Sequence, residues 1–283
     1  MKIAVISLMS LLLCFSPAAV LHAATNEIFT FGVGEFTVSM LSEMQGERSP
    51  DILIGASEED IAKFAATGNI PFAMAAFLIQ SPDGAFLVDT GVGNLIPGHL
   101  KSLGVEMEDI EALFITHSHR DHIGGMLTDE RPAFPNAKVF VSKPEYDWSE
   151  QLRETLGKYD GKYETMIPGT LESGGRELAK GIYAAEAYGH TPGHTMFMLN
   201  SGGEKLLIWG DLTHAMAVQM PRPGVSVTFD ADPEAAAAAR EKVLKFAADN
   251  EIPVAGMHIA FPGVGDVVPD ADNPGGYKFV PKS

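Results

Sequence analysis

Short apolar runs alternate with polar segments along the chain, and their spacing predicts a domain that mixes strands with helices. A loosely alternating segment that contains glycines predicts a hairpin over residues 28–41. Apolar runs predict strands over residues 77–79, 86–88, 112–115, 138–142, 182–188, 206–209 and 252–257. Helices are predicted over residues 58–66 and 144–156, and a longer helix begins after Asp232 and runs to about residue 249.

Side chains that can bind metal follow the ends of four predicted strands. The strand over residues 112–115 precedes the motif His117-x-His119-x-Asp121-His122. The strand over residues 182–188 precedes Gly189-His190-Thr191-Pro192-Gly193-His194, and the last two strands precede Asp211 and His258. In open α/β sheets, ligand sites assemble at the edge where strands end. We therefore expect these side chains to meet.

The motif over residues 117–122 packs three imidazoles and a carboxylate into six residues, and these are the ligand types that Zn²⁺ prefers. The chain has 9 histidines in 283 residues, so a chance arrangement of this kind is on the order of one in a thousand. That scarcity argues against an ordinary solvated loop. Residues two apart in an extended chain point the same way, so His117 and His119 can converge on one ion.

These strand ends carry enough ligands for two metal ions rather than one. The expected metal ligands are His117, His119, Asp121, His122, His194, Asp211 and His258. A carboxylate has two oxygens, so Asp211 is the natural shared ligand, and two divalent ions, zinc first among them, are the expected cofactors. His190 is expected to be structural, because His194 already fits the motif.

The first 24 residues have the features of an export signal. Lys2 supplies a positive start, residues 3–13 form an almost unbroken apolar run, and small residues near Ala24 offer a cleavage site. A membrane anchor is the alternative, but Pro17 and the early polar residues shorten the run. We expect residues 1–24 to be removed, which leaves residues 25–283 as one domain in the periplasm or outside the cell.

The charge of the chain limits its partners. With 20 basic and 37 acidic residues, the net charge is −17, which opposes binding to nucleic acid or to an anionic membrane. The expected partner is a small-molecule substrate, with no membrane contact after signal cleavage, and a homodimer is left open. The only cysteine, Cys14, lies in the predicted signal, so the mature chain would have no thiolate ligand.

Together these motifs resemble those of the metallo-β-lactamase superfamily, over nearly the whole mature chain. The resemblance implies an α/β fold, the αββα sandwich of two mixed β-sheets with helices on the outer faces. It implies a first metal held by His117, His119 and His194, a second held by Asp121, His122 and His258, and a bridge at Asp211. It also implies that Asp89, within the matching Asp-Thr-Gly, orients a ligand imidazole.

Segments in the C-terminal half resemble the methyl parathion hydrolase branch of that superfamily. They lie at residues 209–214, 218–219, 226–230, 258–263 and 276–281. Two positions depart from other branches. The β-lactamases that use a cysteine ligand have it where this chain has Asp211, and the quorum-signal lactonases have a tyrosine where it has His214. Both departures disfavour those two activities.

The resemblance implies a metal-dependent hydrolase that attacks ester-like bonds with a metal-bound hydroxide. Aryl esters, lactones and organophosphate triesters are the expected substrates. We expect Asp121 to accept a proton, and His214 either to polarise a substrate oxygen or only to brace the site. The alternatives are a β-lactamase, an acyl-homoserine lactonase, a non-catalytic metal-binding protein and a mononuclear iron oxygenase.

The pattern does not predict how the loops that determine specificity fold. We expect residues 46–69 and 148–175 to line the substrate pocket. Trp148 is expected either in the pocket wall or in ordinary helix packing. Phe72 and Met74 are expected in the hydrophobic core.

Overall fold

Two mixed seven-stranded sheets form the centre of the fold in a computed structural model that describes residues 27–283. In spatial order, the first sheet consists of β1 (Ile28–Val33), β2 (Phe36–Arg48), β4 (Ile70–Ser81), β5 (Gly84–Val88), β6 (Ile110–Phe114), β9 (Lys138–Ser142) and β10 (Tyr163–Met166). The second consists of β11 (Arg176–Ala179), β12 (Ile182–Glu186), β13 (Thr195–Ser201), β14 (Glu204–Ile208), β16 (Val254–Ala255), β17 (Val264–Pro269) and β18 (Tyr277–Pro281). The predicted signal, residues 1–24, lies outside the described residues.

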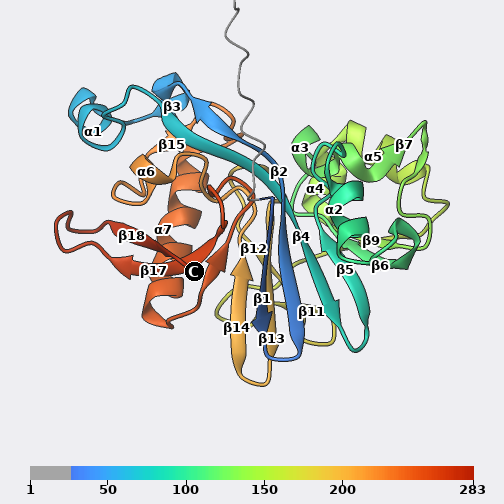
Figure 1. Cartoon of the computed structure of the whole chain (residues 1–283). Coiled ribbons are helices and arrows are strands. Elements are labelled where there is room, and N and C mark those ends of the chain that lie inside the picture. Colours follow the sequence, from blue (N-terminus) through green and yellow to red (C-terminus); the bar gives the residue numbers. More distant parts are fainter. Residues whose placement is uncertain (1–26) are drawn as a thin grey trace, which may run out of the picture.

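Helices cover the outer face of each sheet (Figure 1). The first sheet is flanked by α2 (Ile96–Ser102), α3 (Arg120–Ile123), α4 (Lys143–Trp148) and α5 (Glu150–Gly157). The second is flanked by α7 (Pro233–Asp249), and the short helices α1 (Glu58–Phe64) and α6 (Met216–Gln219) lie near one end. Among residues 27–283, no helix is both long and apolar enough to cross a membrane.

Short elements complete the fold. Two ribbons are formed by β3 (Leu53–Ile54) with β15 (Ser226–Val227) and by β7 (Leu127–Thr128) with β8 (Arg131–Pro132). The 3₁₀ turns are Pro50–Ile52, Met107–Asp109 and Gly124–Met126.

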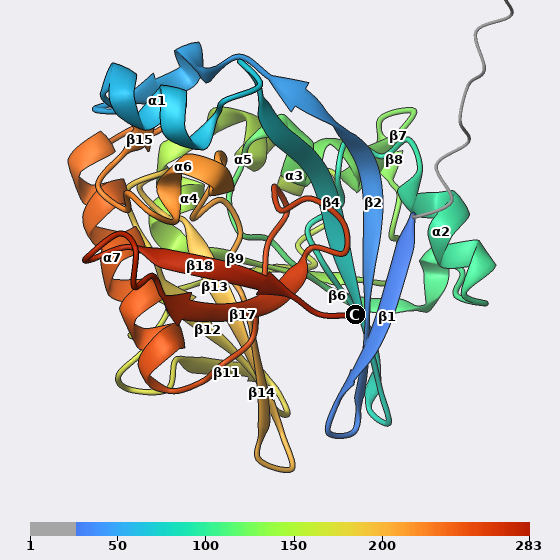
Figure 2. The same cartoon turned by 60° about the vertical axis from the view of Figure 1, so that its left-hand side comes forward.

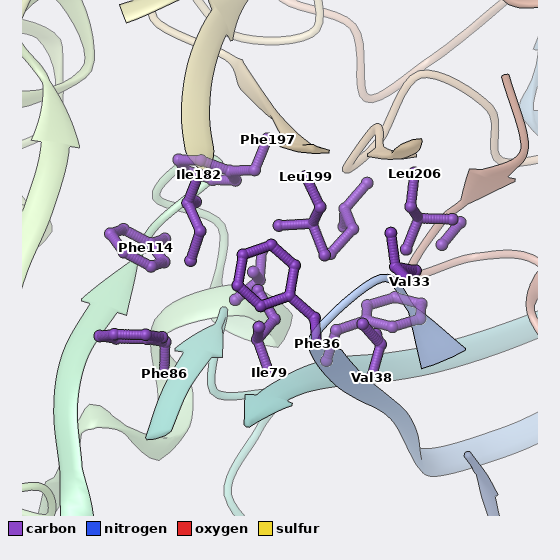
Figure 3. Close-up of a cluster of buried hydrophobic side chains, with 14 of the residues drawn as sticks. Val33, Phe36, Val38, Ile79, Phe86, Phe114, Ile182, Phe197, Leu199 and Leu206 are labelled. Atoms are coloured by element: carbon purple, nitrogen blue, oxygen red, sulfur yellow. The ribbon is translucent and has the colours of Figure 1, made fainter. Parts of the chain in front are cut away.

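The main core lies between the two sheets (Figure 3). Ile79 of β4 and Phe114 of β6 face Phe197 of β13 within one fully buried cluster, and the rings of Phe114 and Phe197 are 5.6 Å apart. Separate buried clusters lie between each sheet and its helices. Each sheet therefore has apolar side chains on both faces, which confirms the expected αββα sandwich.

Local signals in the sequence set several elements accurately. The predicted helix that follows Asp232 is α7, and the Asp232 carboxylate accepts a hydrogen bond from the backbone N–H of Ala235. The predicted strand over residues 138–142 is β9. The single helix predicted over residues 144–156 is instead two helices, because Ser149 is extended and caps the start of α5 by accepting from the N–H of Leu152.

Strands β2 and β4 are longer than the hydrophobic pattern predicted, at 13 and 12 residues, and they project together beyond the rest of the first sheet (Figures 1 and 2). A β-bulge interrupts their register between Ser42 and Met44. The Glu43 carboxylate, at the bulge, accepts hydrogen bonds from the backbone N–H groups of Val92 and Leu95. We call the part beyond the bulge, residues 44–48 and 70–74, the β2–β4 arm.

Candidate metal centre

The histidine motif begins where β6 ends and continues into α3. His117 and His119 lie in the extended segment between them, and His119 is the N-cap of α3. His117 Nε2 is 3.0 Å from His119 Nδ1, and His190 Nε2 is also 3.0 Å from that same atom. Asp211 Oδ2 lies 3.4 Å from His190 Nε2. We call His117, His119 and His190, together with Asp211, the first ligand group.

A second cluster of ligand-type atoms lies beside the first. It contains Asp121, His122 and His258, which we call the second ligand group. His258 Nε2 is 3.4 Å from Asp121 Oδ2, and His122 Nε2 is 3.8 Å from that oxygen. Six of the seven side chains that the sequence predicted as ligands are therefore brought together here.

Asp211 stands between the two groups. Its Oδ1 is 3.1 Å from His122 Nε2, and its Oδ2 is 3.0 Å from His258 Nε2 and 3.6 Å from His117 Nε2. Burial raises the pKa of Asp211, but His122, His258 and other imidazoles outweigh burial and hold that pKa well below its usual value. The low pKa favours the ionised carboxylate, whose Oδ2 lies near both groups and whose Oδ1 lies near the second group only.

The structure differs from the prediction at one side chain, because His190 rather than His194 joins the cluster of ligand-type atoms. The His194 backbone continues the β12–β13 ladder, with its carbonyl accepting from the N–H of Ala187, and the ring lies 5.4 Å from that of His117 without joining the cluster of ligand-type atoms. Both of its ring nitrogens are used: Nδ1 contacts the Ala187 carbonyl at 3.0 Å, and Nε2 accepts from the Asp211 backbone N–H at 2.9 Å. His194 therefore braces the turn that presents Asp211.

His190 is held by a buried chain of polar contacts. Its Nδ1 donates to Asp230 Oδ1 at 2.8 Å, so Nε2 is free to act as a ligand. Asp230 also accepts from the backbone N–H of Val227 and lies 3.8 Å from the Arg240 guanidinium. Arg240 donates to three backbone carbonyls, and burial lowers its pKa to about 10 while Asp230 opposes that shift.

A buried glutamate joins the two loops that carry the first ligand group. Glu145, near the start of α4, accepts from the backbone N–H and the hydroxyl of Ser118, at 2.8 and 2.6 Å. It also accepts from the Thr191 hydroxyl at 2.6 Å and from the Gly193 N–H at 3.1 Å. Ser118 separates His117 from His119, and Thr191 follows His190. Glu145 thus fixes the spacing of the two loops, a role that no local sequence pattern indicates.

The second ligand group has fewer supports. His122 Nδ1 donates to Asp89 Oδ2 at 2.6 Å, which agrees with the orienting role implied for Asp89. His258 Nδ1 donates to the Ala73 carbonyl at 2.6 Å. The Asp121 side chain is 22% exposed, and among residues 27–283 it makes no hydrogen bond that would fix its orientation.

Burial favours the neutral state, which is the state that binds metal, in two imidazoles of the first group. Burial lowers the pKa of His119 to about 4, and burial also lowers the pKa of His117 well below its usual value. Burial likewise lowers the pKa of His122, but Asp211 and Asp89 outweigh it and raise that pKa. The same balance with Asp211 raises the pKa of His258.

The residues present fit a divalent cation. Three imidazole nitrogens converge within the first group, an arrangement that suits a positive ion better than hydrogen bonding alone. Within residues 27–283, His122 Nε2 and Asp211 Oδ1 are buried and have no hydrogen-bond partner, although they face each other. Nitrogen and carboxylate ligands without thiolate are typical of zinc sites in hydrolytic enzymes.

A cavity of about 550 Å³ opens over the two groups. Its lining consists of Arg48, Met74, Val92, His119, Arg120, Asp121, Asp211, His214, Phe229 and His258. His214 Nε2 is 3.0 Å from Asp211 Oδ2, and within the described part of the chain its buried Nδ1 has no partner. Burial lowers the pKa of His214 to about 3.

The structure places three apolar or aromatic side chains for which the sequence led to expectations: Met74, Phe72 and Trp148. Met74 lines the cavity instead of the core, because it belongs to the projecting β2–β4 arm. Phe72, on the same arm, is buried but stacks on the ring of His258 at 5.6 Å. Trp148 is 47% exposed at the end of α4, with its ring 6.4 Å from that of His119, and it is not among the residues that line the cavity.

Sequence comparison identifies the family. Residues 71–256, more than half of the chain, match the model of the metallo-beta-lactamase superfamily. An N-acyl homoserine lactonase from Bacillus sp is 26% identical over 154 residues, which cover 44% of this chain and 57% of that protein. A hydroxyacylglutathione hydrolase from Synechococcus sp. is 31% identical over 144 residues, covering 49% of this chain and 48% of that one. The chain thus matches about half the length of these relatives.

Solved structures show the same fold. A dizinc quorum-quenching lactonase, AidC, superposes with a TM-score of 0.79 at 24% identity, covering 91% of this chain and 98% of that one. The hydrolase AbOPH, described as a member of the beta lactamase superfamily, superposes with a TM-score of 0.78 at 24% identity and the same coverage. With the ligand clusters and the family match, these likenesses lead to one conclusion: the chain belongs to the metallo-beta-lactamase superfamily.

Proposed function

We propose that the mature chain is an exported hydrolase that holds two divalent metal ions and cleaves ester-like bonds. Zinc is the metal that we expect. The observation that carries this proposal is the position of Asp211 in the cavity wall, within reach of both ligand groups. Its Oδ2 lies 3.4 and 3.6 Å from His190 and His117 of the first group, and the second group lies 3.0 Å from Oδ2 through His258 and 3.1 Å from Oδ1 through His122. A single ion would leave one of the two groups without a cation. A protein that only stores metal would have no need of a cavity over the ligands.

The side chains have distinct roles in this proposal. The first group would hold one ion and the second group the other, with Asp211 shared between them. When bound, the two ions supply Lewis acidity and lower the pKa of water, so that a nucleophile is available at neutral pH. Asp121 is the partly exposed carboxylate of the site, and we assign it the role of proton acceptor. We assign His214, in the cavity wall, to bracing Asp211, because its neutral imidazole donates its one N–H to that carboxylate at 3.0 Å.

The proposed scissile bond is an uncharged ester-like bond in an aryl ester, a lactone or an organophosphate triester. Relatives named as lactonases and as a hydroxyacylglutathione hydrolase support ester chemistry. Asp211 in place of a cysteine ligand disfavours β-lactams, and His214 in place of tyrosine separates the chain from the quorum-signal lactonases. The C-terminal motifs favour the methyl parathion hydrolase-like branch.

One substrate panel tests the activity. Zinc-loaded protein is assayed with p-nitrophenyl acetate, γ- and δ-lactones, methyl paraoxon and nitrocefin, and kcat/KM is compared at matched metal content. We expect an ester, lactone or triester to lead, and His117→Ala to abolish that activity. A lead of more than tenfold for nitrocefin, or full activity in His117→Ala, would contradict the proposal.

Metal analysis tests the number of ions. Protein purified without chelator should contain about two equivalents by elemental analysis. One equivalent under saturating zinc would overturn the two-ion proposal. Iron as the single metal after anaerobic purification would favour an oxygenase instead.

Export is proposed from the first 24 residues. The intact mass of the protein from its native host should correspond to a chain that begins near Ala24 or Thr25. A mass that includes residues 1–23 would instead support a membrane anchor.

A further inference from the structure

Arg48 is positioned over the cavity by the β2–β4 arm. It is the last residue of β2 and pairs with Ile70 of β4, so its side chain lies on the same face as Phe72, two residues further along β4. Gly46, opposite Phe72, has no side chain that would occupy this face. The Arg48 guanidinium carbon lies 3.5 Å from the centre of the Phe72 ring.

This stack connects Arg48 to the metal centre. The Phe72 ring stacks on the imidazole of His258 at 5.6 Å and 27°, so this ring contacts both the guanidinium and a histidine of the second ligand group. Phe229, which also lines the cavity, is 5.8 Å from the same guanidinium and lies against His214. Two aromatic rings thus restrict Arg48 while its donors face the cavity.

Arg48 has no anionic partner of its own. It is half-buried, and within residues 27–283 no carboxylate lies within 4.0 Å of its guanidinium. Burial lowers its pKa, and the more distant charges of Asp121 and Asp211 raise it. In the proposed enzyme both carboxylates are committed to metal ions. They therefore cannot neutralise Arg48 as well.

The charge of the cavity is opposite to that of the whole chain. The chain carries 37 acidic and 20 basic residues. The charged side chains of the cavity wall, other than the two ligand carboxylates, are Arg48 and Arg120, and neither forms an ion pair within the described part of the chain. An acidic protein that presents two unpaired arginines in one cavity creates a local preference for anions.

We propose, as a refinement that rests on the proposed ester hydrolysis, that Arg48 binds a carboxylate on the substrate at a distance from the scissile bond. The planar guanidinium can donate two parallel hydrogen bonds to a carboxylate. Its stacking on Phe72 fixes the plane of that donor pair in advance. The preferred substrates are therefore esters or lactones that carry an acid group, while the bond that breaks is uncharged.

A matched pair of rigid esters tests this inference. The anionic probe is 4-acetoxybenzoate, and the neutral probe is 4-acetoxybenzamide, which has the same shape and the same acetyl ester. For the zinc-loaded wild type, we expect kcat/KM for the anionic ester to exceed that for the neutral ester by about tenfold to a hundredfold, the usual strength of a charge-assisted contact. In Arg48→Met the ratio should fall to about one, mainly through KM. Arg48→Lys, which keeps the charge but not the planar fork, should be intermediate.

Controls separate this inference from the function on which it rests. The control variant is Lys138→Met. Lys138 also lies over a phenylalanine ring, that of Phe140, but outside the cavity, so this variant should keep the wild-type ratio of kcat/KM between the two esters. Calorimetric titration of the zinc-loaded protein with the product 4-hydroxybenzoate gives a readout that does not depend on turnover. Arg48→Met should weaken that binding by about tenfold or more.

The outcomes are distinguishable. If the wild type hydrolyses neither ester at full zinc loading, the proposed function fails. If it hydrolyses both with a ratio near or below one, or if Arg48→Met keeps the wild-type ratio and product affinity, the role of Arg48 is overturned and ester hydrolysis stands.

Discussion

The two ligand groups share Asp211 but differ in how the fold supports them. In the first group, His190 is backed by Asp230, and the loops of all three histidines are joined by the buried Glu145. In the second group, His122 Nδ1 is held by Asp89, and His258 Nδ1 is held by the Ala73 carbonyl under the stacked ring of Phe72. Its third member, Asp121, is partly exposed at the cavity.

This difference has a physical consequence for metal binding. Ligands whose orientation is set before the ion arrives lose little conformational freedom on binding, so they hold the ion tightly. A ligand that is free to move binds more weakly, but it can also exchange contacts with substrate. We infer that the first group is the more permanent metal position and that the second is the one that responds to substrate.

The largest expected effect comes from removing the residue that both groups share. Asp211→Ala should lose at least one equivalent of metal and lower kcat/KM by about 10³-fold or more, because metal charge stabilisation is worth several kcal/mol. Elemental analysis and steady-state kinetics measure this. Asp266→Ala, on the exposed face of β17, is the control. If Asp211→Ala keeps two equivalents of metal, the two ligand groups do not depend on a common carboxylate.

Replacing each of the two histidines of one loop by alanine tests which of them belongs to the first group. His190→Ala should lose one equivalent and about 10²-fold or more in kcat/KM. His194→Ala should keep two equivalents but unfold more easily, by about 1–3 kcal/mol, because the buried N–H of Asp211 loses its acceptor. Metal analysis and urea denaturation measure the pair. The opposite pattern of metal loss would restore His194 as the ligand.

Glu145→Gln tests the support of the first group without touching a ligand. A glutamine keeps the shape of Glu145 but replaces one acceptor oxygen by an NH₂ group, which opposes a donor. We expect the affinity for one of the two zinc ions to fall by about 10- to 100-fold. Competition with a chromophoric chelator measures both affinities. Glu154→Gln, exposed on α5, is the control, and unchanged zinc affinities in Glu145→Gln would contradict the supporting role.

The smallest expected effect is a difference in rate between the two ions. Dialysis against a weak chelator should remove one equivalent about tenfold faster than the other, because Asp121 is partly exposed and has no hydrogen bond that fixes it among residues 27–283. Anomalous diffraction from partly depleted crystals should then place the remaining ion among His117, His119 and His190. Simultaneous loss, or a remaining ion beside Asp121, would remove the distinction between the groups.

Much of the site could be predicted because its information is local. Apolar runs marked β6, β12 and β14, and the ligands follow directly where these strands end. The spacing within residues 117–122 needs only the geometry of an extended chain that turns into a helix. The cap at Asp232 likewise defined α7 from three neighbouring residues.

The choice between His190 and His194 was not local. Both follow the same strand, and spacing alone does not tell which ring faces the other ligands. Contacts of the two rings distinguish them: the His194 ring bonds to the Ala187 carbonyl and to the Asp211 backbone N–H, whereas His190 Nε2 faces His119. Glu145 is also far from its partners in the sequence, because 27 positions separate it from Ser118 and 46 separate it from Thr191.

By itself, the sequence determined the sandwich fold, the metal-binding chemistry and the ligands that lie within a few residues of a strand end. Only the tertiary structure decided which histidine completes the first group, which carboxylate supports it and which arginine faces the cavity. The physical reason is range. Propensity, capping and periodicity act between neighbours in the chain, whereas Glu145, Asp230 and Arg48 reach the site through packing between segments that the sequence keeps far apart.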